Sequence, residues 1–270
     1  MGSYIVSIPD SFGPRILGFR RKDGPDLFAT LDDDVVLGHS ESGVYRFRGG
    51  HRLWAAPELP AVTYAPDDEE CEVSYGRGLV TLAGPVDRAG LSKRLVVTAE
   101  GSSLVVDHTL TNHEPEAREL APWAITQFRM GGFALMPLGR SESNVQGDRS
   151  LTVWPYTDLS DPRLVMDQSS LTVAAQPGPA FKIGVGPNPG RLGYLLDGWL
   201  FLKEIALAVN RPYADRGAVG QIFVERHFCE LESLGALIRL GPGERVSHRE
   251  LWSLTECNGI ETARQRVVAV

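Results

Sequence analysis

The chain has 270 residues, of which 43% are hydrophobic and 23% are charged, and its formal net charge is −7 at pH 7. This composition is typical of a globular protein and excludes a disordered or membrane-like one. An acidic balance without a basic stripe argues against nucleic acid as a partner. No stretch approaches the roughly 18 consecutive apolar residues that a membrane span needs, so we expect no membrane insertion.

The start of the chain and the cysteines bear on where the protein works. Residues 1–9 lack the basic segment and the long apolar run of a signal peptide. Cys71, Cys229 and Cys257 are odd in number and far apart, which suits reduced thiols. We therefore expect a cytoplasmic protein. Because glycine and proline are spread evenly and no repeat interrupts the chain, we expect one domain over residues 1–270.

The first part of the chain is predicted to form strands. Residues 3–48 contain short apolar stretches separated by turns, and the acidic run at 31–34 lacks the ligand spacing of an EF-hand. Residues 71–112 alternate in the manner of a β-meander. His108 and His113 lie at polar positions near the end of this meander, and we expect both at the surface.

The segment Gly49–Glu58 places an imidazole, a guanidinium, an indole and a carboxylate close together in the sequence. The two glycines at its start allow the backbone to bend or to approach another segment closely. Sugars suit the mixture of His51, Arg52, Trp54 and Glu58, because an indole stacks on their C–H faces and polar groups bind their hydroxyls. The alternative is a loop whose Trp54 belongs to the core and whose Arg52 pairs with Glu58.

The middle of the chain continues the strand pattern. Further strands are predicted in the segments 120–137, 181–186, 191–197 and 199–207. A loop at 210–217 carries Asp215. No long run with a period of 3.6 residues and helix caps is present, so helices are expected to be few and short.

The stretch Phe223–Leu254 contains the most informative candidate residues for a functional site. It contains the turn Gly241–Glu244 with strand patterns on either side. Alternation places Phe228, Glu230 and Glu232 on one face of the first strand. Buried carboxylates cost free energy unless they are paired or hydrogen-bonded, so two of them beside apolar neighbours are unusual.

Two interpretations of these glutamates remain open. In the first, they lie on a solvated outer face or form a structural ion pair with Arg226, Arg239 or Arg249. In the second, one of them, preferably Glu232, points into a cavity and transfers protons. On the last strand of this stretch, alternation aligns Val246, His248, Glu250, Trp252 and Leu254.

A metal site is not predicted. Glu225, His227 and Cys229 would share a strand face, but the cysteines lack paired zinc spacing, so a partly buried strand histidine beside a free cysteine is favoured. We expect neither a metal nor another cofactor.

Several short motifs, in order along most of the chain, resemble the galactose mutarotase-like superfamily, most closely a bacterial group of uncharacterised members within it. They are Gly49–Trp54 with Ala56–Glu58, Asn112–Pro115 with Ala121–Ala124, Phe201–Lys203, Tyr213–Gly217, Glu230–Gly235 and Pro242–Glu244. The resemblance implies an all-β fold, a large twisted β-supersandwich. In aldose 1-epimerases the catalytic base is a glutamate in a Leu-Glu step before a Pro-Gly-Glu turn, which corresponds to Glu232. The general-acid histidine corresponds in position to Trp123.

The resemblance implies an isomerase that opens the ring of a monosaccharide by acid–base catalysis, with a sugar or sugar derivative as its ligand. We expect Glu232 to be the base and His51 to be the substitute acid. The residues expected to bind the sugar are Arg52, Trp54, Glu58, Trp123, Gln127, Lys203, Asp215 and Glu230. The alternative is a non-catalytic carbohydrate-binding or sensing protein. Polysaccharide lyase chemistry ranks lower because no helical toroid is present. The protein is expected to be a monomer or a homodimer.

Overall fold

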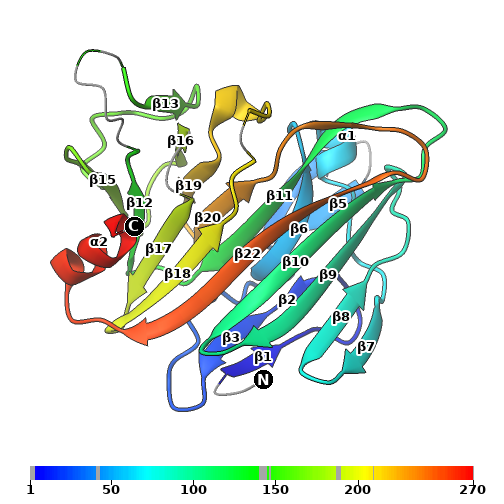
Figure 1. Ribbon diagram of the computed structural model, residues 1–270, viewed down its shortest axis with the longest axis horizontal. Helices are drawn as coiled ribbons and strands as arrows, with labels where there is room; N and C mark the ends of the chain where they lie inside the picture. Colours follow the sequence, from blue (N-terminus) through cyan, green and yellow to red (C-terminus); the bar gives the residue numbers. More distant parts are fainter. Residues whose placement is uncertain are drawn as a thin grey trace.

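The computed structural model describes residues 4–40, 43–139, 145, 147–186, 190–208 and 210–269. Two large β-sheets face each other and account for most of the described chain (Figure 1). All strand pairs of the sheets are antiparallel within this part. The predicted all-β class, with few short helices, is confirmed.

The larger sheet has ten strands. In spatial order they are β14 (Leu164–Met166), β15 (Ser170–Ala174), β12 (Phe133–Pro137), β17 (Arg191–Leu196), β18 (Trp199–Ile205), β22 (Arg245–Glu256), β10 (Ser103–Asn112), β9 (Leu91–Glu100), β8 (Leu79–Ala83) and β7 (Glu72–Gly76). The long strands β22, β10 and β9 lie side by side in this sheet, as Figure 1 shows.

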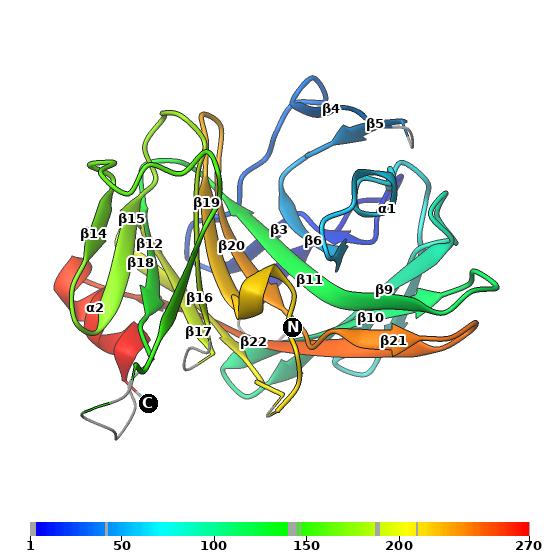
Figure 2. The same cartoon turned by 90° about the horizontal axis from the view of Figure 1, so that it is seen from above.

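The smaller sheet has eight strands. Its order is β13 (Ser150–Val153), β16 (Phe181–Gly186), β19 (Gly220–Val224), β20 (Cys229–Leu234), β11 (Arg118–Phe128), β6 (Gly50–Ala56) and β2 (Arg15–Ile16), with β21 (Ile238–Leu240) also paired to β11. Seen from above in Figure 2, β11 of this sheet runs alongside β10 and β22 of the larger sheet.

Short elements complete the described fold. Two small two-stranded sheets pair β1 (Tyr4–Ser7) with β3 (Gly18–Arg21) and β4 (Val36–Ser40) with β5 (Gly43–Arg46). The helices are α1 (Pro60–Thr63), the 3₁₀ turn η1 (Asp215–Gly217) and α2 (Ile260–Val268). In the described part, no helix has both the length and the apolar character needed to cross a bilayer.

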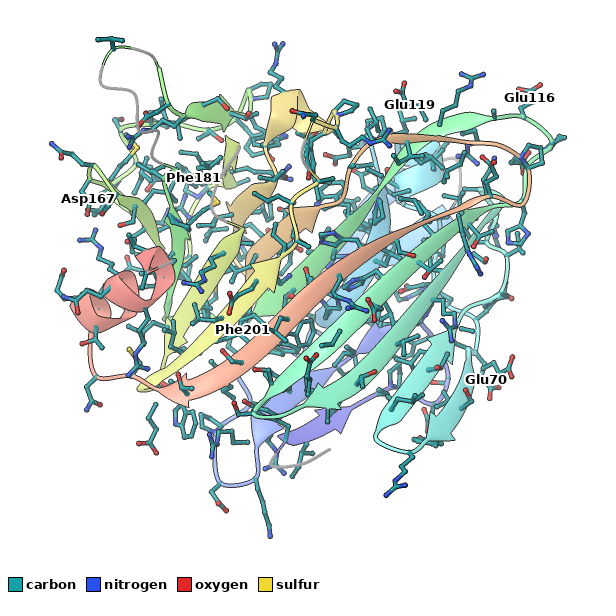
Figure 3. The ribbon with its side chains drawn as sticks, viewed as in Figure 1. Glu70, Glu116, Glu119, Asp167, Phe181 and Phe201 are labelled. Atoms are coloured by element: carbon teal, nitrogen blue, oxygen red, sulfur yellow. The ribbon has the colours of Figure 1, made fainter. Side chains whose placement is uncertain are left out.

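The main core lies between the two sheets. Phe128 of the smaller sheet meets Phe201 and Trp252 of the larger one there. The ring centroids of Phe128 and Phe201 are 5.2 Å apart, and those of Phe201 and Trp252 are 5.5 Å apart. Such tilted and edge-on pairs add to the free energy gained by burying the rings. Phe201 from β18 and Phe181 from β16, both labelled in Figure 3, belong to this core.

Alternation along β6 divides its side chains between two environments. His51 and Leu53 point toward the larger sheet, whereas Arg52 and Trp54 point to the outer face of the smaller sheet. All seven residues of the strand are nevertheless buried. The outer face must therefore be covered as well, and a second apolar cluster that includes Trp54 and Trp123 lies on it.

Glycine is required where the chain enters β6. Gly49 and Gly50 have φ values of +84° and +71°. A Cβ atom would lie 1.9 Å from the carbonyl oxygen of Ala29 at Gly49 and 2.3 Å from that of Ile16 at Gly50. The close approach expected from these two glycines is thus present, and it fixes the path of the strand that carries Arg52 and Trp54.

Two predictions about histidines and cysteines can be compared with the structure. His113 is exposed as expected, but the surface position predicted for His108 is wrong, because this side chain points from β10 toward the smaller sheet, contacts His51 and is completely buried. The three cysteines are free thiols, and all are buried.

Candidate functional site

A pocket of about 270 Å³ opens on the outer face of the smaller sheet, across β16, β19, β20, β11 and β6. Its lining consists of Leu37, Phe47, Arg52, Trp54, Glu58, Tyr64, Trp123, Tyr156, Ala180, Lys182, Phe223, Glu230 and Glu232. It is near the lower end of the roughly 300–1,000 Å³ of small-molecule sites, which suits a single small ring. The structure thus brings together six of the ten residues predicted for the site.

Register explains why these side chains meet. Residues directly opposite each other on neighbouring strands point to the same face. Lys182 is opposite Phe223, and Phe223 is opposite Glu230. Trp54 is opposite Trp123, and their rings make an edge-on contact with centroids 5.4 Å apart. The pocket floor is therefore set by strand pairing rather than by loops.

Glu232 is buried at the floor of the pocket, with 1% of its surface exposed. Its Oε2 accepts hydrogen bonds from Trp123 Nε1 and from Lys182 Nζ, each at 2.8 Å. Its Oε1 has no hydrogen-bond partner among the described residues. Burial raises the pKa of Glu232 to about 7; the charge of Lys182 opposes this rise and the charge of Glu230 adds to it.

Arg52 forms the second buried ion pair of the pocket. Its Nη2 donates to Glu230 Oε1 at 3.0 Å, and its guanidinium lies 4.1 Å from the ring centroid of Trp54. Its Nε and Nη1 have no partner in the described part of the chain. The alternative pairing of Arg52 with Glu58 is therefore not observed. The alternative partner Arg249 pairs with Asp107 instead, at 2.7 Å.

Lys182 was missed by the sequence analysis. It lies between two indoles, with Nζ 4.6 Å from the ring centroids of both Trp123 and Trp154. Every residue of its strand, β16, is buried. The signal that would have indicated it is a single lysine in the apolar run Phe181–Gly186, because a buried ammonium needs a partner.

The rim of the pocket carries two tyrosines and an acid. The Tyr64 hydroxyl donates a short hydrogen bond to Glu58, which is exposed at the entrance. Burial raises the pKa of Tyr64 further above its ordinary range, helped by this hydrogen bond. Burial, followed by the charge of Glu232, also raises the pKa of Tyr156.

Two predicted residues, His51 and Lys203, lie elsewhere. His51 points from β6 into the space between the sheets, where it contacts Thr126 at 2.8 Å and His108 at 2.7 Å. Lys203 comes from the larger sheet and pairs with Glu250 at 3.0 Å. Because neighbouring residues of a strand face opposite ways, Arg52 reaches the pocket and His51 does not.

The other two predicted residues are near the pocket but not in its lining. Gln127 shares the outer face and is opposite Glu230, and its amide atoms have no partner among the described residues. Asp215, in η1, accepts a hydrogen bond of 2.7 Å from Gln221.

A polar network occupies the interior behind β20. Glu250 accepts hydrogen bonds from Ser233 at 2.5 Å and Trp252 at 2.7 Å, and pairs with Lys203. Its pKa lies below its ordinary value because the charge of Lys203 outweighs the effect of burial. Lys203 also donates to the carbonyl of Leu231, next to Glu232, at 3.2 Å.

The hydrogen bonds assign the histidine tautomers in this network. The carbonyl of His248 can only accept, so His108 Nδ1 donates to it at 3.0 Å. Burial lowers the pKa of His51 and His108, so both are neutral. His108 Nε2 must then accept from His51 Nε2, and His51 Nδ1 from the Thr126 hydroxyl.

His51, His108 and Glu250 are also the group best placed to hold a metal, with ligand atoms within 4.8 Å of one another. Binding an ion would break the hydrogen bond between the two imidazoles and place a second cation beside the Lys203 ammonium. The donor set is therefore satisfied without a metal.

A second hollow, of about 190 Å³, lies near β8 and the turn at Gly13. Among its charged side chains, Arg46 pairs with Asp68 at 3.1 Å and Lys93 pairs with Asp87 at 2.8 Å. None of its lining residues has a buried side-chain polar atom without a partner in the described part of the chain, whereas Arg52, Trp54 and Glu232 in the other pocket do.

Comparisons with known proteins were made for sequence and for structure. No protein-family model matches the sequence, and no match is found among curated proteins. Solved structures do match: a galactose mutarotase-like protein from Lactobacillus casei superposes with a TM-score of 0.57 at 12% identity, covering 93% of this chain and 100% of that one. The chain has the galactose mutarotase-like fold.

Two further structures agree with this assignment. A candidate mutarotase from Salmonella typhimurium has a TM-score of 0.58 at 8% identity. The superposition covers 94% of this chain and 90% of that one. A candidate aldose 1-epimerase from Escherichia coli K12 has a TM-score of 0.51 at 13% identity, with coverage of 94% and 99%. At these identities, the galactose mutarotase-like fold is what the likeness shows.

Proposed function

We propose that the pocket around Glu232 binds a monosaccharide or a derivative of one and that Glu232 acts as the base of an aldose 1-epimerase-type reaction. The observation that carries the proposal is a buried carboxylate with a pKa near 7, in a pocket walled by indoles. A base is most efficient when its pKa is close to the working pH. The fold shared with mutarotase-like proteins supports the same substrate class.

The lining suits a sugar in composition. Trp54 and Trp123 offer indole surface to C–H groups, and two guanidinium nitrogens of Arg52, Nε and Nη1, have no partner among the described residues. Glu232 Oε1 is an acceptor without a partner in the same set. Buried polar groups in proteins are nearly always hydrogen-bonded, so these atoms are suited to the hydroxyls of a ligand.

In the proposed reaction, Glu232 takes the proton of the C1 hydroxyl while the ring oxygen gains a proton. The bond between C1 and the ring oxygen breaks, and the open-chain aldehyde rotates about its C1–C2 bond. Closure with the proton transfers reversed gives the other anomer.

Polarimetry on freshly dissolved aldoses tests this proposal. The wild type should accelerate the approach to anomeric equilibrium, and Glu232→Gln should reduce that acceleration by about 10²–10⁴-fold, the usual contribution of a positioned base. Glu72→Gln, on the exposed edge strand β7, is the matched control and should retain the wild-type rate. An unaffected Glu232→Gln variant would exclude Glu232 as the base.

The alternative is a carbohydrate-binding protein without catalysis. It is favoured by the nature of the lining, in which no described residue is a histidine. Isothermal calorimetry distinguishes the two functions: sugar binding by the wild type without any rate acceleration would support the binding protein.

A further inference from the structure

We propose that Lys182 is the proton donor to the ring oxygen, the role that a histidine has in aldose 1-epimerases. This role rests on the proposed function and names the acid that the reaction requires. Neither His51 nor any other described histidine lines the pocket, so the acid must come from another residue type.

The geometry of the reaction demands a base and an acid side by side. The C1 hydroxyl and the ring oxygen are both bonded to C1, so the groups that exchange protons with them must be close neighbours. Lys182 Nζ lies 2.8 Å from Glu232 Oε2, while Oε1 of the same carboxylate has no partner among the described residues. Glu232 can therefore face the hydroxyl through Oε1 while Lys182 faces the ring oxygen.

The other proton donors of the lining suit this task less well. The guanidinium of Arg52 stays protonated in proteins and cannot release a proton. The Tyr64 hydroxyl is committed to Glu58, and burial raises the pKa of both Tyr64 and Tyr156, which makes them weaker acids. Lys182 is left as the donor in direct contact with the base.

Two indoles fix the ammonium in place. Lys182 Nζ lies 4.6 Å from the ring centroids of Trp123 and Trp154, within the range of a cation–π contact. Trp123 also donates to Glu232, so one residue positions both members of the pair. This arrangement holds the lysine side chain beside the base and restricts its motion.

The protons and electrons balance without another reactant. Glu232 accepts the proton of the C1 hydroxyl, and the electron pair of the breaking bond goes to the ring oxygen, which takes a proton from Lys182. The open-chain aldehyde then faces a neutral carboxyl and a neutral amine. On closure, the amine recovers its proton from the hydroxyl, and the carboxyl returns one to the oxygen on C1.

The test compares two buried lysines that are each 2.8 Å from a carboxylate. Lys182→Met should lower kcat about 10²-fold or more, while sugar affinity measured by calorimetry changes by less than about threefold. Lys93→Met removes the pair with Asp87, away from the pocket, and should keep the wild-type rate. Methylammonium added to Lys182→Ala should restore activity, because a small ammonium ion can enter the space of the missing side chain and donate the proton.

The outcomes separate this role from the proposed function. A wild type that accelerates mutarotation together with a Lys182→Met variant as fast as it, or a slow Lys182→Ala variant that methylammonium does not rescue, would overturn the role of Lys182 alone. A wild type that accelerates no aldose would overturn the proposed function and this role with it.

Discussion

Glu232 shows how one strand position can set the chemistry of a pocket. Its carboxylate is taken out of water by the sheet, and two donors, Trp123 and Lys182, bind the same oxygen. Burial outweighs these favourable contacts, which is why its pKa is raised and not lowered. Activity that depends on the ionised base should therefore fall as the pH drops below about 7.

Trp123→Phe tests the contribution of the indole N–H. This donor stabilises the ionised form of Glu232, so its removal should raise the pKa of Glu232 further. A hydrogen bond to a charged group contributes about 1.5–3 kcal/mol, which corresponds to a rise of at least about one pH unit. The acid limb of the pH–rate profile, and the titration of the Glu232 carboxyl carbon by NMR, should both move upward. An unchanged midpoint in both measurements would contradict the role given to the indole.

Single-residue predictions from sequence depended on knowing which way a strand faces. The motif Gly49–Glu58 was recognised as rich in polar and aromatic groups, and Arg52, Trp54 and Glu58 do line the pocket. His51 does not line the pocket, because it is one residue away from Arg52 on the strand and its side chain therefore points to the opposite face of the sheet. The sequence alone did not indicate which residues of β6 face the pocket and which face the interior, because both faces of this strand are buried.

At the scale of elements, the strand β20 lies between the pocket on one face of the smaller sheet and the buried polar network around Glu250 on the other. Its outer face presents Glu230 and Glu232 to the pocket, while Ser233 on its inner face binds Glu250. The Lys203 ammonium donates a hydrogen bond to the carbonyl of Leu231 on the same inner face. A buried ion pair of the larger sheet therefore supports the backbone that carries the proposed base.

Lys203→Met should destabilise the fold by about 3–5 kcal/mol, because it leaves the Glu250 carboxylate buried without its ion-pair partner. The double variant Lys203→Met with Glu250→Gln should recover part of this loss, since no uncompensated charge remains. Chemical denaturation measures both. Arg249→Met, from the exposed pair with Asp107, is the control and should cost less than about 1 kcal/mol. Equal losses for Lys203→Met and Arg249→Met would contradict this account.

The elements themselves were largely predictable, but their pairing was not. Alternation and turn residues indicated strands over most of the chain, and the all-β class follows from them. Yet the pocket depends on contacts such as that between Arg52 and Glu230, which are 178 residues apart. The order of strands in each sheet decides such contacts, and local patterns carry no information about it.

For the whole molecule, the buried histidines predict sensitivity to acid. Burial lowers the pKa of His248 to about 3, and it lowers the pKa of His51 and His108 as well, from an ordinary value of 6.5. Below pH 6.5 the unfolded chain therefore binds more protons than the folded one, and the free energy of unfolding decreases as the pH falls.

The melting temperature should accordingly fall steadily between pH 6.5 and pH 4. Each histidine that stays neutral in the folded state contributes up to about 1.4 kcal/mol per pH unit in this range. His248→Gln preserves a donor toward Ser233 but does not titrate, so its melting temperature should depend less on pH. His113→Gln, at an exposed position, should leave the slope unchanged. Identical slopes for wild type and His248→Gln would refute the prediction.

The division of β6, β11 and β20 into a pocket face and an interior face has a practical meaning for protein engineering. Substitutions at Leu37, Phe47, Tyr156 and Phe223, which line the pocket without belonging to either ion pair, can be combined in a library without disturbing the interior network. Selection on such a library would alter ligand preference while the histidines and Glu250 behind the sheet keep the scaffold intact.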